Sequence, residues 1–391
     1  MSKNANSSDT PEEGLIAESG VDPAETQGKK EQEVTYSVSG GLVGFLASNK
    51  ISIAISSYQS GKFYLLGCNP KGGIMIHERF FQKAMGISVE NGAILLATLF
   101  QIIKFENVLD EEQFINETHD ACYVPRQSYV TGSLDAHDVG LMQDGRIIFV
   151  NTRYNCLSVF SERHSFKPVW KPKFISKIVD EDRCHLNGLA MDEGRPRYVT
   201  AVSRSDTVDG WRDRRSNGGI VIDIENDEIV CSGLSMPHSP RIYRSKLWVL
   251  NSGTGELGWV DTDEKDKAKA FKSLCFCPGF VRGLAFHGNY AFVGLSRPRY
   301  ERFEGLALDE KLSEADSEPW CGTQVIDLET GNCVHWFRID GAVAELYDVG
   351  VVPGVSCPMA LGFANNDIMS FITHDELDED ALHAPAAAIE A

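Results

Sequence analysis

Short runs of β-branched and aromatic residues alternate with turn residues along most of the chain. Between about residues 37 and 372, Gly, Asn and Asp separate runs such as "GRIIFVNTRYNCLSVF", "GGIVIDIENDEIVCSG" and "KLWVLNSGTGELGWVD". Short apolar runs bounded by turn residues predict strands and hairpins, and little helical periodicity accompanies them. One helix is expected around residues 304–315, inside a long loop. We therefore predict an all-β domain over residues 37–372.

One local pattern recurs through this domain. "KAMGIS", "HDVGLM", "HLNGLA", "FVRGLA" and "YDVGVV" each place a glycine before an apolar residue, and "HSPRIY" fits with Arg241 at the glycine position. Three positions earlier, at intervals of 42 to 67 residues, stand Lys83, His137, His185, His238, Phe280 and Tyr347. Such intervals are typical of four-stranded propeller blades. The repeat predicts a six-bladed β-propeller, with a seven-bladed ring as the alternative.

The two ends of the domain are expected to share one blade. The segment "ISIAISSYQSGKFYLLGCNPKGGIMIHERFF" contains three strands without a matching first one, and the last unit, from Glu345 to about Phe371, is too short for a full blade. We predict that the N-terminal strands pair with the C-terminal strand. Closure of this kind removes the open sheet edges that favour aggregation.

A propeller brings the three repeated histidines together, because the first strand of each blade lines the central channel. His137, His185 and His238 hold one position in three successive blades. Three converging imidazoles are a competent site for a divalent transition metal with an open coordination position, and zinc, iron and copper all suit imidazole. The competing interpretation is structural, since a histidine in a strand commonly hydrogen-bonds a backbone carbonyl. A metal-free acid–base or binding site is a third interpretation.

Other polar residues are expected near the same channel mouth. Second strands end in Arg153, Arg204 and Arg297, and the repeat places Arg241 and Arg282 deeper. Arginine forks match carboxylate and phosphate groups, so these five side chains predict an anionic ligand. The candidates for acid–base or supporting roles are Asp138, Asn187, Tyr347 and Lys83. Two long loops, 203–219 and 296–322, are predicted to lie over this face, with Trp211 and Tyr300 as possible ligand contacts.

Charge and composition narrow the class of protein. The net charge is −19, but residues 1–35 and 374–391 together hold −11 of it. These acidic segments lack aromatic residues, so we predict disordered tails over 1–36 and 373–391. A mildly acidic body argues against nucleic acid as a partner, and no apolar run is long enough to span a membrane. The N-terminus has no apolar signal region and the ten cysteines suit reduced thiols, so a cytoplasmic location is expected.

Several phrases resemble an uncharacterised bacterial family of conserved hypothetical proteins of β-propeller type. They are "DRCHLNGLA", "SMPHSPR", "LWVLNSGTGELG", "PGFVRGLAFHGNYAFVGLSRPR" and "YDVGVVPG", and the resemblance covers about residues 40–370. More loosely, the arrangement is similar to six-bladed lyase and lactonase propellers, including peptidyl-amidating lyases, whose axial metal is held by histidines from separate blades. That architectural resemblance does not fix the function.

Two functional hypotheses follow. The first is a metal-dependent lyase, hydrolase or oxidoreductase that acts on an anionic small molecule or peptide. In it, His137, His185 and His238 bind the metal and the arginines orient the substrate. The second is a non-catalytic propeller that binds a peptide or protein partner at the same face.

Overall fold

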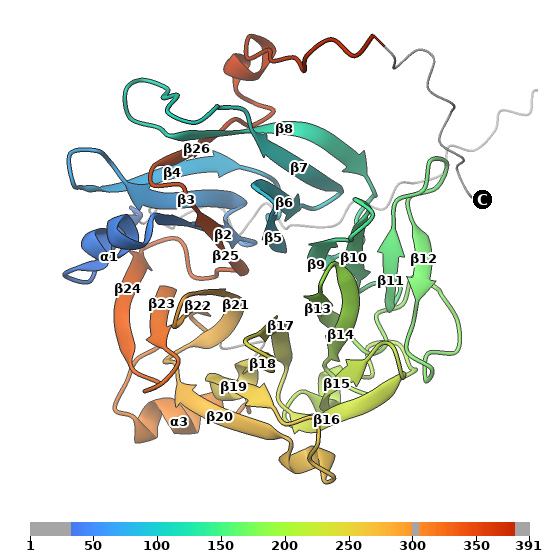
Figure 1. The fold of residues 1–391 in the computed structure, drawn as a ribbon. Coiled ribbons are helices and arrows are strands. Elements are labelled where there is room, and N and C mark those ends of the chain that lie inside the picture. Colours follow the sequence, from blue (N-terminus) through green and yellow to red (C-terminus); the bar gives the residue numbers. More distant parts are fainter. Residues whose placement is uncertain (1–32, 299–304, 380–391) are drawn as a thin grey trace, which may run out of the picture. The chain divides into compact units, whose positions relative to one another are not determined.

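Six sheets, antiparallel except for one added strand, are arranged around a central channel in the computed structural model (Figure 1). The chain divides into a short unit, Met1–Glu33, and a large unit, Val34–Ala391, which forms the ring. The described residues are 33–298 and 305–379. They contain six sheets, which confirms the six-bladed β-propeller over the seven-bladed alternative.

Three successive blades have four strands each, in chain order from the channel outward. Their strands are β9 (Ala136–Leu141), β10 (Ile147–Asn151), β11 (Cys156–Val159) and β12 (Lys167–Trp170); β13 (Leu186–Asp192), β14 (Arg195–Ala201), β15 (Gly219–Asp223) and β16 (Glu228–Leu234); and β17 (Pro237–Tyr243), β18 (Lys246–Asn251), β19 (Glu256–Val260) and β20 (Phe271–Phe276).

The predicted closure of the ring is confirmed. The closing blade contains β25 (Asp348–Pro353), β2 (Ile51–Ser57), β3 (Lys62–Cys68) and β4 (Ile74–Phe80), with β2 antiparallel to β25. The three outer strands of this blade come from the N-terminal part of the chain, and the channel strand β25 comes from the C-terminal part. About 300 residues of intervening chain are thereby held between the two ends of one sheet.

Two blades carry a fifth strand. One contains β21 (Phe280–His287), β22 (Tyr290–Ser296), β23 (Cys321–Asp327) and β24 (Cys333–Asp340), and β1 (Thr35–Val38) pairs with its outer edge. The other contains β5 (Ile87–Glu90), β6 (Ala93–Ala97), β7 (Gln101–Asn107) and β8 (Ala121–Val130), and β26 (Pro358–Ala360) adds to it in parallel. These two additions were not predicted, because each strand comes from outside the repeat.

Helices are few among the described residues. They are α1 (Leu42–Asn49), α3 (Leu308–Glu314) and the 3-10 turns η2 (Arg212–Arg214), η3 (Ser252–Thr254), η4 (Lys267–Lys269) and η5 (Asn366–Met369). The helix α3 lies where the sequence predicts one. No helix in the described ranges is long and apolar enough to cross a membrane.

The core lies between the blades, which explains why the middle strands are buried on both faces and mostly apolar. All seven residues of β2 and all five of β10 are buried. One cluster joins Ile148 and Leu157 of one blade to Leu189 and Ile220 of the next. Burial of such side chains contributes roughly 1.5–3 kcal/mol each, so packing between blades is a main source of stability.

The repeated glycine is explained by the narrow spacing of the channel strands. A Cβ at Gly86 would lie 2.7 Å from the carbonyl oxygen of His137, and one at Gly188 would lie 2.9 Å from the amide nitrogen of Ser239. A Cβ at Gly283 would lie 2.5 Å from the amide nitrogen of Val349. Each glycine therefore lets its strand approach the backbone of the neighbouring blade.

The predicted domain boundaries differ slightly from the structure. Strand β1 begins at Thr35, two residues before the predicted start of the propeller. Of the predicted tails, residues 1–32 and 380–391 lie outside the described residues, and residues 374–379 contain no helix or strand.

Candidate active site

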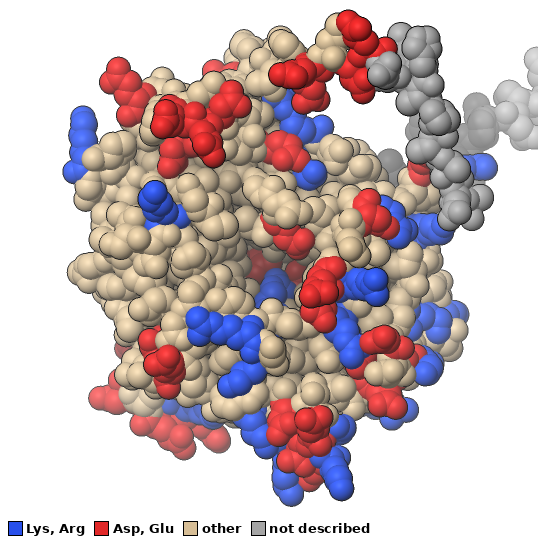
Figure 2. All heavy atoms as spheres, in the orientation of Figure 1, with Lys and Arg blue, Asp and Glu red and all other residues tan. Residues whose placement is uncertain are grey.

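A cavity of about 350 Å³ opens where the channel strands begin, and we call it the channel-mouth cavity. It is lined by Tyr58, Lys83, Met85, Asp135, His137, Asp182, His185, Trp211, Arg212, Arg215, Met236, Arg282, Glu345 and Tyr347. The face drawn in Figure 2 is also hollowed near the centre of the ring, and acidic and basic side chains surround that hollow, although the picture labels no residue of the channel-mouth cavity. The volume falls in the range of small-molecule sites.

His137 and His185 meet in this cavity, as the repeat predicts. Their ring centroids lie 4.9 Å apart with the planes at 85°. Tyr347, from the same position of the closing blade, lies 5.6 Å from the ring of His137. Residues far apart in the chain thus form one cluster because they hold one place in the repeated blade.

The proton of His137 is fixed on Nδ1. This nitrogen lies 2.7 Å from the carbonyl oxygen of Asp135 and 2.8 Å from the hydroxyl of Thr152, which donates its own proton to the carbonyl of Leu186. Both neighbours accept, so Nδ1 donates and the neutral ring carries a lone pair on Nε2. Burial lowers the pKa of His137 to about 3, which keeps the ring neutral at physiological pH.

His185 is held differently, by a carboxylate. Its Nδ1 lies 2.6 Å from Oδ2 of Asp182, and Oδ1 of Asp182 also accepts from its backbone amide. The indole of Trp211 stacks on the ring at 4.2 Å. In the blade of His185, Arg204 holds the position that Thr152 holds in the blade of His137. Arg204 is exposed and has no hydroxyl, so no hydroxyl competes with Asp182 for Nδ1 of His185. An imidazole oriented by a carboxylate through Nδ1 is the arrangement of a general base.

His238 is placed apart from the other two. It is 3% exposed, it does not line the cavity, and both of its nitrogens are hydrogen-bonded. Nδ1 contacts the carbonyl of Met236 and the hydroxyl of Ser252, while Nε2 accepts from the amide of Asn187 at 2.9 Å. These contacts match the interpretation of His238 as a structural residue that hydrogen-bonds its neighbours. Asn187, which donates to His238, is likewise structural.

Of the three predicted ligands, His137 and His185 line the cavity and His238 does not, so the donor set fits two imidazole ligands. Among the residues that the structure describes, no group of three or more His, Cys, Asp or Glu is arranged to hold a metal ion. The three-histidine metal site, and with it zinc, iron or copper, stays a prediction that this geometry does not support.

The predicted supporting residues separate into two groups. Lys83 and Tyr347 line the cavity, and Lys83 pairs with Asp135 at 2.5 Å. Asp138 lies below it, 3% exposed, and binds Arg241 at 2.7 Å and the amide of Leu189 at 2.9 Å. Asp138 therefore links neighbouring channel strands and does not reach a ligand in the cavity.

Among the predicted arginines, Arg282 alone lines the cavity. Arg153 binds Asp180 and the carbonyl of Ser133, and Arg297 binds the carbonyls of Gly341 and Val343. Arg204 is exposed, and Arg241 pairs with Asp138. Arg153, Arg241 and Arg297 are turned toward these partners and Arg204 is exposed outside the cavity. The basic residues that line the cavity are Lys83, Arg212, Arg215 and Arg282.

Loop 203–219 reaches the site as predicted, through Trp211, Arg212 and Arg215. Tyr300, the candidate from the other long loop, lies outside the described residues. Sequence reasoning missed Asp135 and Asp182, although each stands two or three residues before a histidine. That short spacing was a usable signal, because both carboxylates precede the strand on the channel side.

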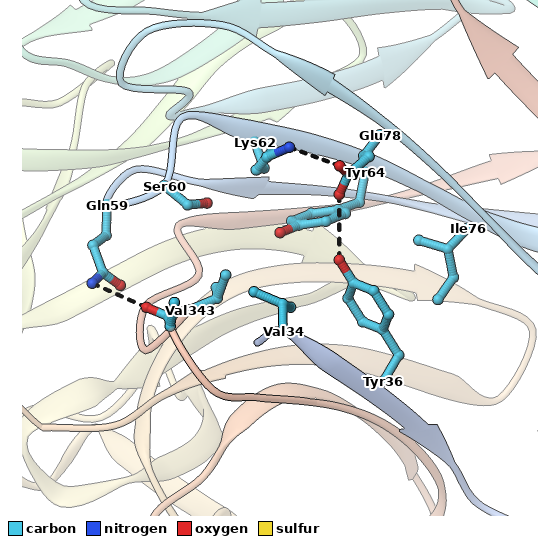
Figure 3. Close-up of a pocket in the computed structure, with 10 residues that line it drawn as sticks. Val34, Tyr36, Gln59, Ser60, Lys62, Tyr64, Ile76, Glu78 and Val343 are labelled. Atoms are coloured by element: carbon cyan, nitrogen blue, oxygen red, sulfur yellow. Dashed lines mark hydrogen bonds and ion pairs between the residues drawn. The ribbon is translucent and has the colours of Figure 1, made fainter. Parts of the chain in front are cut away.

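A larger cavity of about 580 Å³ lies beside β1 and is a weaker candidate (Figure 3). Its charged groups satisfy each other: Lys62 lies 2.7 Å from Glu78, and the hydroxyl of Tyr36 donates to Glu78 at 3.3 Å. The channel-mouth cavity combines paired charges with titratable rings, which is the usual character of a functional site.

A family model matches residues 40–361, which is most of the chain. The chain belongs to the DUF4915 family, a domain of unknown function. The match confirms the resemblance found in the sequence, and a search of curated proteins finds no match.

Several solved structures match most of this chain at low identity and with TM-scores below 0.5. A nidogen/laminin complex is 11% identical, with 78% of this chain and 99% of that chain covered and a TM-score of 0.47. A protein of unknown function from Bacteroides caccae is 9% identical (77% and 98% covered, TM-score 0.45). Virginiamycin B lyase from Staphylococcus aureus is 10% identical (78% and 99% covered, TM-score 0.35). At these identities the likeness concerns the fold alone.

Proposed function

We propose that this DUF4915 propeller is an enzyme that moves a proton on an anionic small molecule bound in the channel-mouth cavity. The observation that carries the proposal is the Asp182–His185 pair, 2.6 Å apart, beside the neutral ring of His137. Both rings line the cavity and use Nδ1 for their hydrogen bonds, which leaves Nε2 for a substrate, and the basic side chains of the cavity favour an anionic ligand.

His185 is the general base in this proposal. Its Nε2 takes a proton from a C–H or O–H group of the substrate, and the freed electron pair forms a new bond within the substrate. The imidazolium then returns the proton to another atom of the substrate or to the group that leaves. Asp182 stabilises the imidazolium that forms. His137, whose pKa is about 3, stays neutral and accepts a hydrogen bond that orients the substrate. The lyase and hydrolase hypotheses both need such a base.

Metabolite profiling tests the proposal without a known substrate. A metabolite extract is incubated with the wild-type protein, with Asp182→Asn and with His185→Gln, and its composition is followed by mass spectrometry. We expect the wild type to convert at least one anionic metabolite and both variants to lose roughly 100-fold or more of that rate. His164→Gln, on the exposed surface, is the matched control.

Two results would contradict the proposal. Equal conversion by the wild type and His185→Gln removes the proposed base. Retention of a metabolite or peptide by the wild type without any conversion supports the alternative, a non-catalytic binding propeller. Elemental analysis of untagged protein tests the metal prediction separately, through a stoichiometric metal that is lost in His137→Ala and His185→Ala.

A further inference from the structure

Arg282 is a cation in the channel-mouth cavity without a counter-charge. The structure shows no hydrogen bond or ion pair between its guanidinium and any described residue, and its Nε is buried without a partner. Burial lowers its pKa, and the groups that act against this effect are Tyr347 and Tyr58 and not a carboxylate of the described residues. An unpaired buried charge is costly unless something pairs with it.

Arg241, another arginine of the channel strands, has a guanidinium that is paired with carboxylates. Arg241 lies 2.7 Å from Asp138 and 3.6 Å from Asp348, and it also donates to the carbonyl of Leu189. Both arginines come from channel strands, β17 and β21. Arg241 has carboxylate partners and Arg282 has none among the described residues. Arg282 is also the one of the two that lines the cavity.

Two further polar groups of this cavity are buried without a partner. They are the hydroxyl of Tyr347 and the indole nitrogen of Trp211. Buried polar groups in native proteins are nearly always hydrogen-bonded, so each needs a partner. Arg282, Tyr347 and Trp211 can all donate, and three unmatched donors in one cavity call for an acceptor-rich ligand.

The surroundings of Arg282 favour a planar acceptor. Its guanidinium carbon lies 5.0 Å from the ring centre of Phe280 and 5.3 Å from that of Tyr347. Aromatic rings on a guanidinium leave its in-plane edge for hydrogen bonds, and that edge matches a carboxylate bidentately.

We propose that Arg282 and the hydroxyl of Tyr347 bind a carboxylate group of the ligand, with the indole nitrogen of Trp211 as a further donor. The inference rests on the proposed function, because it names the substrate class of the same site. The rings of His137 and Tyr347 are 5.6 Å apart, so the bound carboxylate lies beside the imidazoles and brings the neighbouring atoms of the substrate within their reach.

Calorimetry with simple anions tests this proposal. Benzoate, succinate, inorganic phosphate and sulfate are titrated into the full chain at pH 7 and constant ionic strength. We expect a carboxylate to bind more tightly than phosphate or sulfate. Arg282→Gln should weaken it roughly 10- to 100-fold and Tyr347→Phe about 3- to 10-fold, since charge-assisted hydrogen bonds contribute about 1.5–3 kcal/mol and neutral ones about 1.

Two variants keep the result interpretable. Arg153→Gln removes a charge that is paired with Asp180 outside the cavity and should leave binding unchanged. Arg282→Lys keeps the charge without the planar fork and should bind with intermediate affinity, which guards against a folding defect in Arg282→Gln.

The proposal is overturned if the wild type binds no carboxylate of the panel, if Arg282→Gln binds equally well, or if phosphate binds more tightly. Calorimetry reads binding and not turnover. A carboxylate that binds through Arg282 while no metabolite is converted would therefore count against the proposed enzyme and leave the carboxylate site standing.

Discussion

At the scale of single residues, the same histidine has different roles in neighbouring blades. His137 and His238 are held by a hydroxyl and a carbonyl on Nδ1, whereas His185 is held by Asp182. His185 therefore has a carboxylate partner, whereas His137 and His238 contact a hydroxyl that also donates to the next blade. Side-chain partners, and not the repeat itself, decide which ring can act on a ligand.

The hydroxyl of Thr152 is expected to stabilise the ring by joining two blades. It donates to the carbonyl of Leu186 in the next blade and accepts from His137. Thr152→Val keeps the shape, removes the donor to the carbonyl of Leu186 and leaves Nδ1 of His137 with the carbonyl of Asp135 alone, so we expect a loss of about 1–3 kcal/mol in the free energy of unfolding. Denaturant unfolding measures it, with the exposed Thr262→Val as control. Equal stability of the two variants would contradict this role.

Sequence reasoning could bring residues together but could not orient them. The repeat predicted that His137 and His185 meet, because their distance depends on the backbone. The rotation of Arg153 toward Asp180 and the hydrogen bonds of His238 depend on neighbours from other strands. These partners lie up to about 50 residues away in the sequence from the side chains they bind, and no local sequence pattern indicates them.

At the scale of elements, the chain ends are tied to the ring by strands from outside the repeat. Strand β26 adds in parallel to β8, and the carbonyl of Ala360 in β26 accepts from Nε2 of His77 in β4 at 2.9 Å. His77 therefore links β4 of the closing blade to β26, the strand that is added to the neighbouring blade. Burial lowers the pKa of His77 to about 4.

Acid should weaken this link. Because the pKa of His77 falls from 6.5 to about 4 on folding, the unfolded chain takes up a proton below about pH 6.5 and the folded chain does not. The stability that depends on neutral His77 is complete above pH 6.5 and falls by roughly 1.4 kcal/mol per pH unit toward pH 4. His77→Gln keeps a donor that cannot titrate, so its unfolding free energy should fall less steeply with acid.

Unfolding free energies of the wild type and His77→Gln between pH 4 and 7.5 measure this difference. His164→Gln, which removes an exposed histidine, should follow the wild-type curve. Parallel curves for the wild type and His77→Gln would show that His77 is not held neutral by burial.

At the scale of the whole molecule, the channel strands pack too closely for side chains at the repeated glycine. Because this spacing requires a glycine in most blades, the glycine recurs in the sequence. The recurring glycine and the strand pattern together predicted the six blades and the closure of the ring. Where the repeat has Arg241, the side chain turns to Asp138 and Asp348. The ring geometry thus fixes both the glycine positions and the place of the site.

Gly188→Ala should destabilise the ring. The added Cβ would lie 2.2 Å from Cδ of Pro240 and 2.9 Å from the amide nitrogen of Ser239, so β13 and β17 must separate. We expect a loss of about 1–3 kcal/mol or more, as for overpacked cores. Gly44→Ala, in α1 with no atom within 4 Å, should instead gain about 0.5–1 kcal/mol. Thermal unfolding distinguishes the two, and a tolerated Gly188→Ala would contradict the close packing.

The most direct test of the account is a crystal structure of the full chain grown with benzoate at pH 7. We predict the carboxylate on the guanidinium of Arg282 within reach of the Tyr347 hydroxyl, with Nε2 of His137 and of His185 facing the ligand. Benzoate bound elsewhere, or imidazoles of residues 137 and 185 turned away from the cavity, would contradict it.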